Sequence, residues 1–85
     1  MKEKQEQKIG VVKSFFSKIN VAAIGLEADL KIGDKIRVKG ATTDFQQKVA
    51  SMQIDREEIT EASQGDEIGI KVKERVRPND FVYRI

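Results

Sequence analysis

The stretch IGDKI at residues 32–36 recurs as QGDEI at residues 64–68 and, more loosely, as PNDFV at residues 78–82. Each copy places Asp directly after Gly or Asn, and a β-branched residue follows two positions later. Glycine adopts positive φ at little cost, and an aspartate side chain can accept a hydrogen bond from the nearby backbone. The repeat therefore predicts three turns, each leading directly into a β-strand.

A ligand site at these aspartates is the functional alternative to a turn. A calcium loop needs closely spaced oxygen ligands, whereas the three aspartates lie far apart along the chain. No Gly-rich loop followed by Lys and Ser or Thr opens a helix, so the sequence has no phosphate-binding nucleotide motif either. We therefore favour the turn and expect no metal, cofactor or nucleotide.

The composition of the 85-residue chain indicates one small domain without ordinary catalytic chemistry. A chain of this length buries roughly 60–65% of its unfolded surface, which leaves one core and no deep active-site cleft. The absence of Cys and His excludes disulfides, thiolate nucleophiles, imidazole bases and Cys/His zinc sites. Ser and Thr lack a suitably spaced base, so we expect no enzyme.

The chain also lacks the signals of a membrane or secreted protein. Its longest apolar run, residues 21–26, is too short to cross a bilayer, and the charged start MKEKQEQK has no apolar core of a secretion signal. We expect a cytoplasmic protein without membrane contact. Residues 1–7 are expected to form a disordered tail, because only Met1 is apolar there, and residues 8–85 to form the folded domain.

The rest of the chain is typical of an all-β protein. β-branched and aromatic residues gather in short runs between turn-forming residues, and no segment sustains an apolar stripe of helical period. The predicted strands are residues 9–16, 20–27, 34–40, 45–55, 66–74 and 81–85. Residues 55–60 are expected to form a loop. Six short antiparallel strands around one core favour a closed barrel, because closure removes exposed sheet edges.

The alternation of side chains predicts which face of each strand is buried. Ile36 and Val38 are expected to point inward while the residues between them point outward, and the run at residues 66–74 alternates in the same way. The run at residues 45–55 changes parity, which predicts a β-bulge near Ala50 and Ser51.

Basic side chains gather in two segments, and six acidic residues with one Arg gather at residues 55–67, so the net charge of +2 hides segregated patches. Alternate residues on a strand lie about 6.6 Å apart, about twice the rise of a duplex, so a basic row can follow a nucleic-acid backbone. The alternative is a solvated outer face. The candidate nucleic-acid-binding residues are Lys35, Arg37, Lys39, Lys71, Lys73, Arg75 and Arg77.

Aromatic rings and one loop supply further candidates beside these basic segments. Most of the five aromatic residues are needed as core, and Tyr83 and Phe16 are expected to be the most exposed and available for base stacking.

The loop GATTDF at residues 40–45 places two hydroxyls and a carboxylate next to the first basic segment. A hairpin turn is the simpler interpretation of that loop.

Five phrases in a fixed order resemble a known family: GVV, LKIGDKIRVKG, KVASMQI, EASQGDEIGIKV and VRPNDFVYRI. The order is similar to that in the second domain of translational GTPases such as elongation factor Tu and initiation factor 2. It is also similar to small elongation-factor-like proteins and to barrel domains of tRNA-modifying enzymes in the collagenase-like peptidase family. In that family the bulged strand carries a Val followed by a Met or Ile, which Val49 and Met52 match. Its Ala-x-x-Gly-Asp phrase is matched by Ala62, Gly65 and Asp66.

The resemblance implies a six-stranded barrel with a role in translation. In elongation factor Tu this barrel helps to hold the aminoacylated end of tRNA, but the GTPase domain has no counterpart here, so nucleotide hydrolysis is not implied. We predict a non-catalytic module that binds tRNA or rRNA. The alternative is an adaptor that docks on a translation factor, a ribosomal protein or a tRNA-modifying enzyme, using the acidic residues 55–67.

Overall fold

The computed structural model describes residues 7–85, and within them the chain forms strands and turns without any helix. The all-β prediction is therefore confirmed. The tail predicted at residues 1–7 lies outside the described residues except for Gln7, which begins the first strand. No helix in this range is long and apolar enough to cross a membrane. The strands are β1 (Gln7–Phe16), β2 (Val21–Leu26), β3 (Leu30–Lys31), β4 (Lys35–Lys39), β5 (Asp44–Lys48), β6 (Met52–Ile54), β7 (Glu57–Ile59), β8 (Glu61–Ala62), β9 (Glu67–Lys71) and β10 (Phe81–Arg84).

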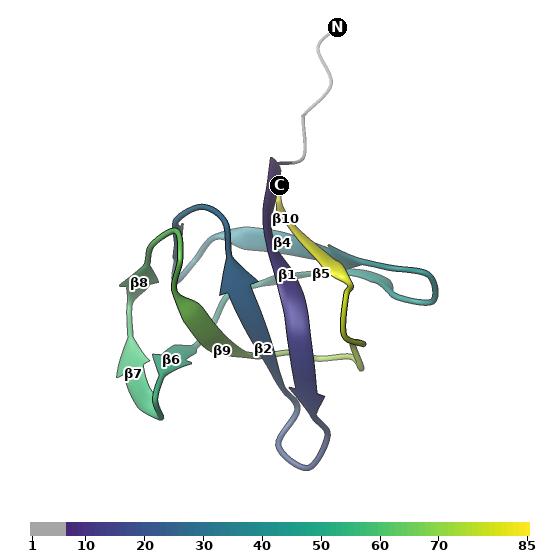
Figure 1. Cartoon of the computed structure of the whole chain (residues 1–85), viewed down its shortest axis with the longest axis horizontal. Coiled ribbons are helices and arrows are strands. Elements are labelled where there is room, and N and C mark those ends of the chain that lie inside the picture. The colour runs from purple at the N-terminus through teal and green to yellow at the C-terminus, as the bar shows by residue number, and fades with distance from the viewer. Residues whose placement is uncertain (1–6) are drawn as a thin grey trace, which may run out of the picture.

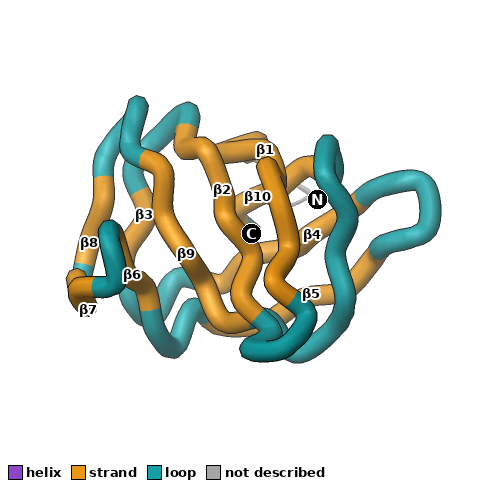
Figure 2. Tube along the Cα trace, turned by 60° about the horizontal axis from the view of Figure 1, so that its bottom comes forward, coloured by secondary structure: helices purple, strands orange, loops and turns teal. Residues whose placement is uncertain are grey.

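Eight strands form one antiparallel sheet in the order β5-β4-β10-β1-β2-β9-β6-β7, and β3 pairs with β8 in a separate small sheet. The large sheet curls around the interior, as Figures 1 and 2 show from two directions. Among residues 7–85 no strand ladder joins the two end strands β5 and β7. The structure thus has more strands than the predicted six, and its sheet is not closed by backbone pairing.

The predicted strand at residues 45–55 is divided into β5 and β6, with a break where a bulge was expected. The bulges lie in β1 instead, where the register shifts between Lys8 and Gly10 and again between Val12 and Ser14. Such bulges increase the local bend, which allows this long strand to pair with β10 at one end and β2 along most of its length. The loop expected at residues 55–60 is wrong in part, because Glu57–Ile59 form strand β7, which pairs with β6, and only residues 55–56 form the turn between them.

The three Asp-containing repeats form the same turn, which confirms the structural interpretation. In each, the backbone N–H three residues earlier donates to the aspartate: Lys31 to Asp34 at 3.1 Å, Ser63 to Asp66 at 2.9 Å and Arg77 to Asp80 at 2.9 Å. The third residue of each turn has positive φ: 96° at Gly33, 94° at Gly65 and 77° at Asn79. The aspartates are thus occupied in closing turns, and residues 7–85 contain no cluster of metal-binding side chains.

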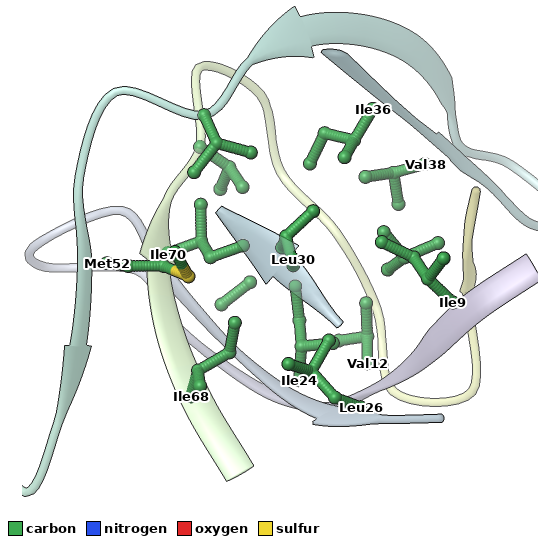
Figure 3. Close-up of a cluster of buried hydrophobic side chains, with 14 of the residues drawn as sticks. Ile9, Val12, Ile24, Leu26, Leu30, Ile36, Val38, Met52, Ile68 and Ile70 are labelled. Carbon is green, nitrogen blue, oxygen red and sulfur yellow. The ribbon is translucent and has the colours of Figure 1, made fainter. Parts of the chain in front are cut away.

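The core lies inside the curled sheet and is almost wholly aliphatic. The alternation predicted for β4 and β9 is confirmed, since both strands bury every second residue. Leu30 comes from the two-residue strand β3, is only 1% exposed, and lies centrally among side chains of the large sheet in Figure 3. Apolar burial of this kind is the main favourable contribution to folding.

Candidate functional site

The first predicted basic row, Lys35, Arg37 and Lys39, lies on the outer face of β4, opposite the buried Ile36 and Val38. The cross-strand partners of this row on β5 are Lys48, Gln46 and Asp44, and those on β10 include Tyr83 and Phe81. The outer face of this part of the sheet therefore combines basic and aromatic side chains.

Arg37 in the middle of this row is held by Asp44. Its Nε lies 2.8 Å from Asp44 Oδ1 and its Nη2 lies 2.9 Å from Asp44 Oδ2, which is a bidentate pair. The hydrogen bond from Arg37 lowers the pKa of Asp44 below its ordinary value. The stabilisation from this pair is present above the ordinary Asp pKa and is lost as the pH falls through the lowered pKa. Arg37 thus orders the surface between β4 and β5.

The second predicted basic segment leaves the sheet. Lys71 ends β9, whereas Lys73, Arg75 and Arg77 lie in the connection to β10, and all four are exposed. This connection is held by the buried Val72 and Val76. The seven predicted residues therefore do not form one continuous surface.

One groove nevertheless joins the two basic segments, because Lys39 and Arg77 both line it. Its volume is about 500 Å³. One wall is the end of β4 with the following loop, the other is the turn before β10, and β10 itself contributes two rings. The groove, which we call the aromatic-basic groove, is lined by Lys39, Gly40, Ala41, Arg77, Pro78, Asn79, Asp80, Phe81 and Tyr83.

The two rings of the groove are arranged edge to face. The centroids of Phe81 and Tyr83 are 6.4 Å apart with an interplanar angle of 84°. Lys8 Nζ lies 4.4 Å from the centroid of Phe81, a cation–π contact, and also lies 3.7 Å from a carboxylate oxygen of Glu27. Phe81 is 42% exposed, so an apolar surface is available to a ligand.

The predicted exposure of the aromatic residues is confirmed only in part. Phe16 is 51% exposed, as expected, but it lies outside the groove. Tyr83 is only partly exposed, and the more exposed ring on β10 is Phe81, which the sequence did not single out. Whether a ring on a terminal strand is covered depends on neighbours that are distant in sequence.

The walls of the groove are fixed by a close contact between Gly40 and Asp80. A Cβ atom at Gly40 would overlap the carboxylate of Asp80, which is 5% exposed and accepts the backbone N–H of Arg77. The turn is also attached to β1, because Val12 N–H donates to the Asp80 carbonyl at 2.8 Å and the Val12 carbonyl accepts from Asn79 at 2.8 Å. These contacts hold the Arg77 side of the groove against the Lys39 side.

The loop at residues 40–45 forms a hairpin turn, as the simpler interpretation predicted. Gly40 N–H donates to the Thr43 carbonyl at 2.7 Å, and Thr43 is buried. Asp44 is paired with Arg37. The loop contributes Gly40 and Ala41 to the groove. The hydroxyl groups of Thr42 and Thr43 and the carboxylate of Asp44 do not line it.

The chain is similar to segments of much longer proteins. It is 43% identical over 76 residues to an uncharacterized protease of Methanocaldococcus jannaschii, covering 88% of this chain and 19% of that protein. It is 37% and 42% identical to two proteins of Porphyromonas gingivalis named collagenase, covering 95% and 92% of this chain. The relatives are named for proteolysis. The chain spans only about a fifth of their length, 19–23%, and no family model matches it.

Solved structures show the same fold. Two crystal structures of the C-terminal domain of a Geobacillus thermoleovorans protein, described as a U32 peptidase, superpose with TM-scores of 0.86 and 0.85. Both are 18% identical to this chain, and they cover 100% and 89% of it and 98% and 96% of the solved domain. At this level of identity the similarity establishes the fold alone.

These relatives correct the assignment made from the sequence. The resemblance to the second domain of translational GTPases is wrong as an identification, because the relatives that the chain matches carry the names protease and collagenase. The predicted function, an RNA-binding barrel in translation or an adaptor on a translation-related protein, is wrong with it. Turns and alternating strands specify a fold, and one fold serves many functions.

Proposed function

We propose that this chain is a non-catalytic accessory domain of a peptidase-family protein, and that its aromatic-basic groove binds an acidic segment of polypeptide. The observation that carries the proposal is the meeting of Lys39 and Arg77, from separate parts of the chain, beside the rings of Phe81 and Tyr83. The names of the relatives and their greater length support a role beside a separate catalytic unit.

The chemistry of the groove suits an acidic peptide. Lys39 and Arg77 are exposed cations on opposite walls, so they can contact carboxylates on two positions of one extended segment. Phe81 and Tyr83 offer flat apolar surface between them, suited to an apolar residue flanked by acidic ones. The chain lacks Cys and His, which supports a binding role over a hydrolytic one.

Charge reversal in the groove tests this function. We expect a fluorescein-labelled peptide of repeating Glu-Gly-Phe units to bind, and the same peptide with Gln in place of Glu to bind much more weakly. Lys39→Glu and Arg77→Glu are each expected to weaken binding about tenfold, or about 1.4 kcal/mol. Fluorescence anisotropy at low and moderate salt measures the affinities, and binding should weaken as salt rises.

The matched control is Lys18→Glu, which makes the same charge change in the exposed turn between β1 and β2. It should alter the affinity less than twofold. Equal weakening by Lys18→Glu would show that net charge alone attracts the peptide, and the groove would be discarded as the site. Cleavage of the peptide by this chain, detected by mass spectrometry, would contradict the non-catalytic role.

We also propose that the curled sheet acts as a closed barrel. β5 and β6 belong to one run of chain, and β5 pairs with β4 while β6 pairs with β9 at the other side. Gln47 bridges the remaining distance, because its amide donates to the Lys71 carbonyl and accepts from Lys73 N–H, both at 2.9 Å. These bonds support closure through a side chain where strand pairing is missing.

Replacement of Gln47 by Leu tests closure. The change removes both bonds and leaves two backbone groups of the β9 end without their partner, so a loss of about 1–3 kcal/mol in unfolding free energy is expected. Amide exchange measured by NMR should accelerate both in β5 and at residues 71–73. Gln46→Leu, on the outer face of the same strand, is the control. Unchanged exchange at residues 71–73 in Gln47→Leu would argue for an open sheet.

A further inference from the structure

A second depression lies over β1, β2, β9 and β6, away from the aromatic-basic groove. Its volume is about 520 Å³. In Figure 1 three of these strands, β1, β2 and β9, lie side by side, and the loop between β1 and β2 extends beyond them. The depression, which we call the hairpin trough, is lined by Ser14, Phe16, Ile19, Val21, Ala23, Gln53, Asp55, Arg56, Glu67, Ile68 and Gly69. It shares no residue with the groove.

The floor of the trough is low because small residues are aligned across neighbouring strands. Ser14 of β1 pairs with Ala23 of β2, Ala23 pairs with Gly69 of β9, and Gly69 pairs with Gln53 of β6. Successive strands lie about 4.8 Å apart, so the small residues Ser14, Ala23 and Gly69 run across the sheet over about 10 Å, and Gln53 stands at the end of the row. The side chains of Val21 and Gln53 narrow the space over Gly69, so the room for a protruding side chain of another molecule lies over Ser14 and Ala23.

A protruding apolar wall borders this floor. Phe16 is 51% exposed and Ile19 is 59% exposed, the two highest values among the exposed large apolar residues of the described chain. Ile19 lies in the turn between β1 and β2, where its backbone N–H donates to the Phe16 carbonyl. This backbone bond closes the turn without help from the Ile19 side chain, so the hairpin does not require an exposed apolar residue at that position.

The rim of the trough carries charges of both signs. Asp55 and Arg56 occupy the turn between β6 and β7, and Glu67 begins β9. None of these three side chains forms an ion pair within residues 7–85. They remain available to opposite charges on another surface.

We propose that the hairpin trough is the interface of a two-fold symmetric dimer of this chain. In a two-fold contact the same patch faces itself, so a protrusion must lie beside a depression and positive charge beside negative charge. The trough meets both conditions: Ile19 of each copy enters the small-residue floor of the other, and Arg56 of each copy faces Asp55 and Glu67 of the other. A surface matched to a different protein has no need of this self-complementarity.

Sedimentation of the full chain over a concentration series tests the dimer. We expect the mass to move from 9.6 kDa toward that of a dimer as concentration rises. Ile19→Asp removes the protrusion and Ala23→Gln fills the floor, and each should raise the dimer dissociation constant at least about tenfold. Ile32→Asp is the control, because Ile32 is 37% exposed and lies outside the trough. Circular dichroism verifies that each variant folds.

A charge exchange makes the test specific for the two-fold geometry. Arg56→Glu should weaken the dimer by placing like charges together, and Arg56→Glu combined with Glu67→Arg should restore it. A monomer at all concentrations, equal dissociation by Ile32→Asp, or failure of the double variant to regain affinity would overturn the proposal. The peptide-binding test of the groove is unaffected by these variants, so the two proposals can fail separately.

Discussion

Gly40→Ala is expected to lower the free energy of unfolding by about 2–4 kcal/mol, a large effect for the addition of one methyl group. The new Cβ would overlap the carboxylate of Asp80, which is buried and held by the backbone N–H of Arg77. Relief requires the aspartate to leave its turn, and a buried carboxylate that loses a hydrogen bond is costly. Urea denaturation followed by circular dichroism measures the change.

A double-mutant cycle identifies the cause. In an Asp80→Ala background the overlap is gone, so Gly40→Ala should cost much less than in the wild-type chain. Gly33→Ala is the matched control: its added Cβ meets no atom within 4 Å, and only the positive φ of 96° penalises it, by about 1 kcal/mol. If Gly40→Ala lowers the free energy of unfolding equally with and without Asp80, the contact between Gly40 and Asp80 does not fix the wall of the groove.

Leu30→Ala is expected to destabilise the protein by about 3–5 kcal/mol. Leu30 is 1% exposed and lies in the middle of the core, so its loss leaves a cavity lined by side chains of several strands (Figure 3). Strand β3 has two residues and pairs only with β8 among the strands of residues 7–85. The contribution of this short segment to stability therefore comes from one buried side chain more than from its hydrogen bonds.

Ile32→Ala is the control for this substitution, since Ile32 lies nearby and is 37% exposed. We expect it to lower the free energy of unfolding by less than about 1 kcal/mol. Thermal and urea unfolding of both variants supply the comparison. A cost near 1 kcal/mol for Leu30→Ala would mean that the small sheet is not packed against the large one in solution.

Local features of the sequence predicted the local features of the structure. The alternation along β4 and β9 indicated their buried faces, because successive side chains on a strand point to opposite sides. The three Asp repeats indicated their turns, because a positive φ and an aspartate acceptor are properties of a few neighbouring residues. The change of parity after residue 49 indicated an irregularity in the strand. In the structure the strand is interrupted there, between β5 and β6, and does not form a bulge.

Features that depend on distant contacts were not predictable in this way. The bulges that place both Ile9 and Val12 in the core arise from the pairing of β1 with two partners, and the sequence of β1 has no distinct signal for them. The exposure of Phe81 depends on the strands that flank β10. The role of Gly40 is visible only once Asp80 is placed against it.

The sequence by itself determined that this chain is a small all-β domain with turns at Asp34, Asp66 and Asp80 and without Cys or His chemistry. These properties depend on residue types and short-range spacing. The tertiary structure decided which charges act together: Arg37 is paired with Asp44, whereas Lys39 and Arg77 meet across one groove. The reason is physical, because the curling of the sheet and the connection from β9 to β10 set distances that no local pattern encodes.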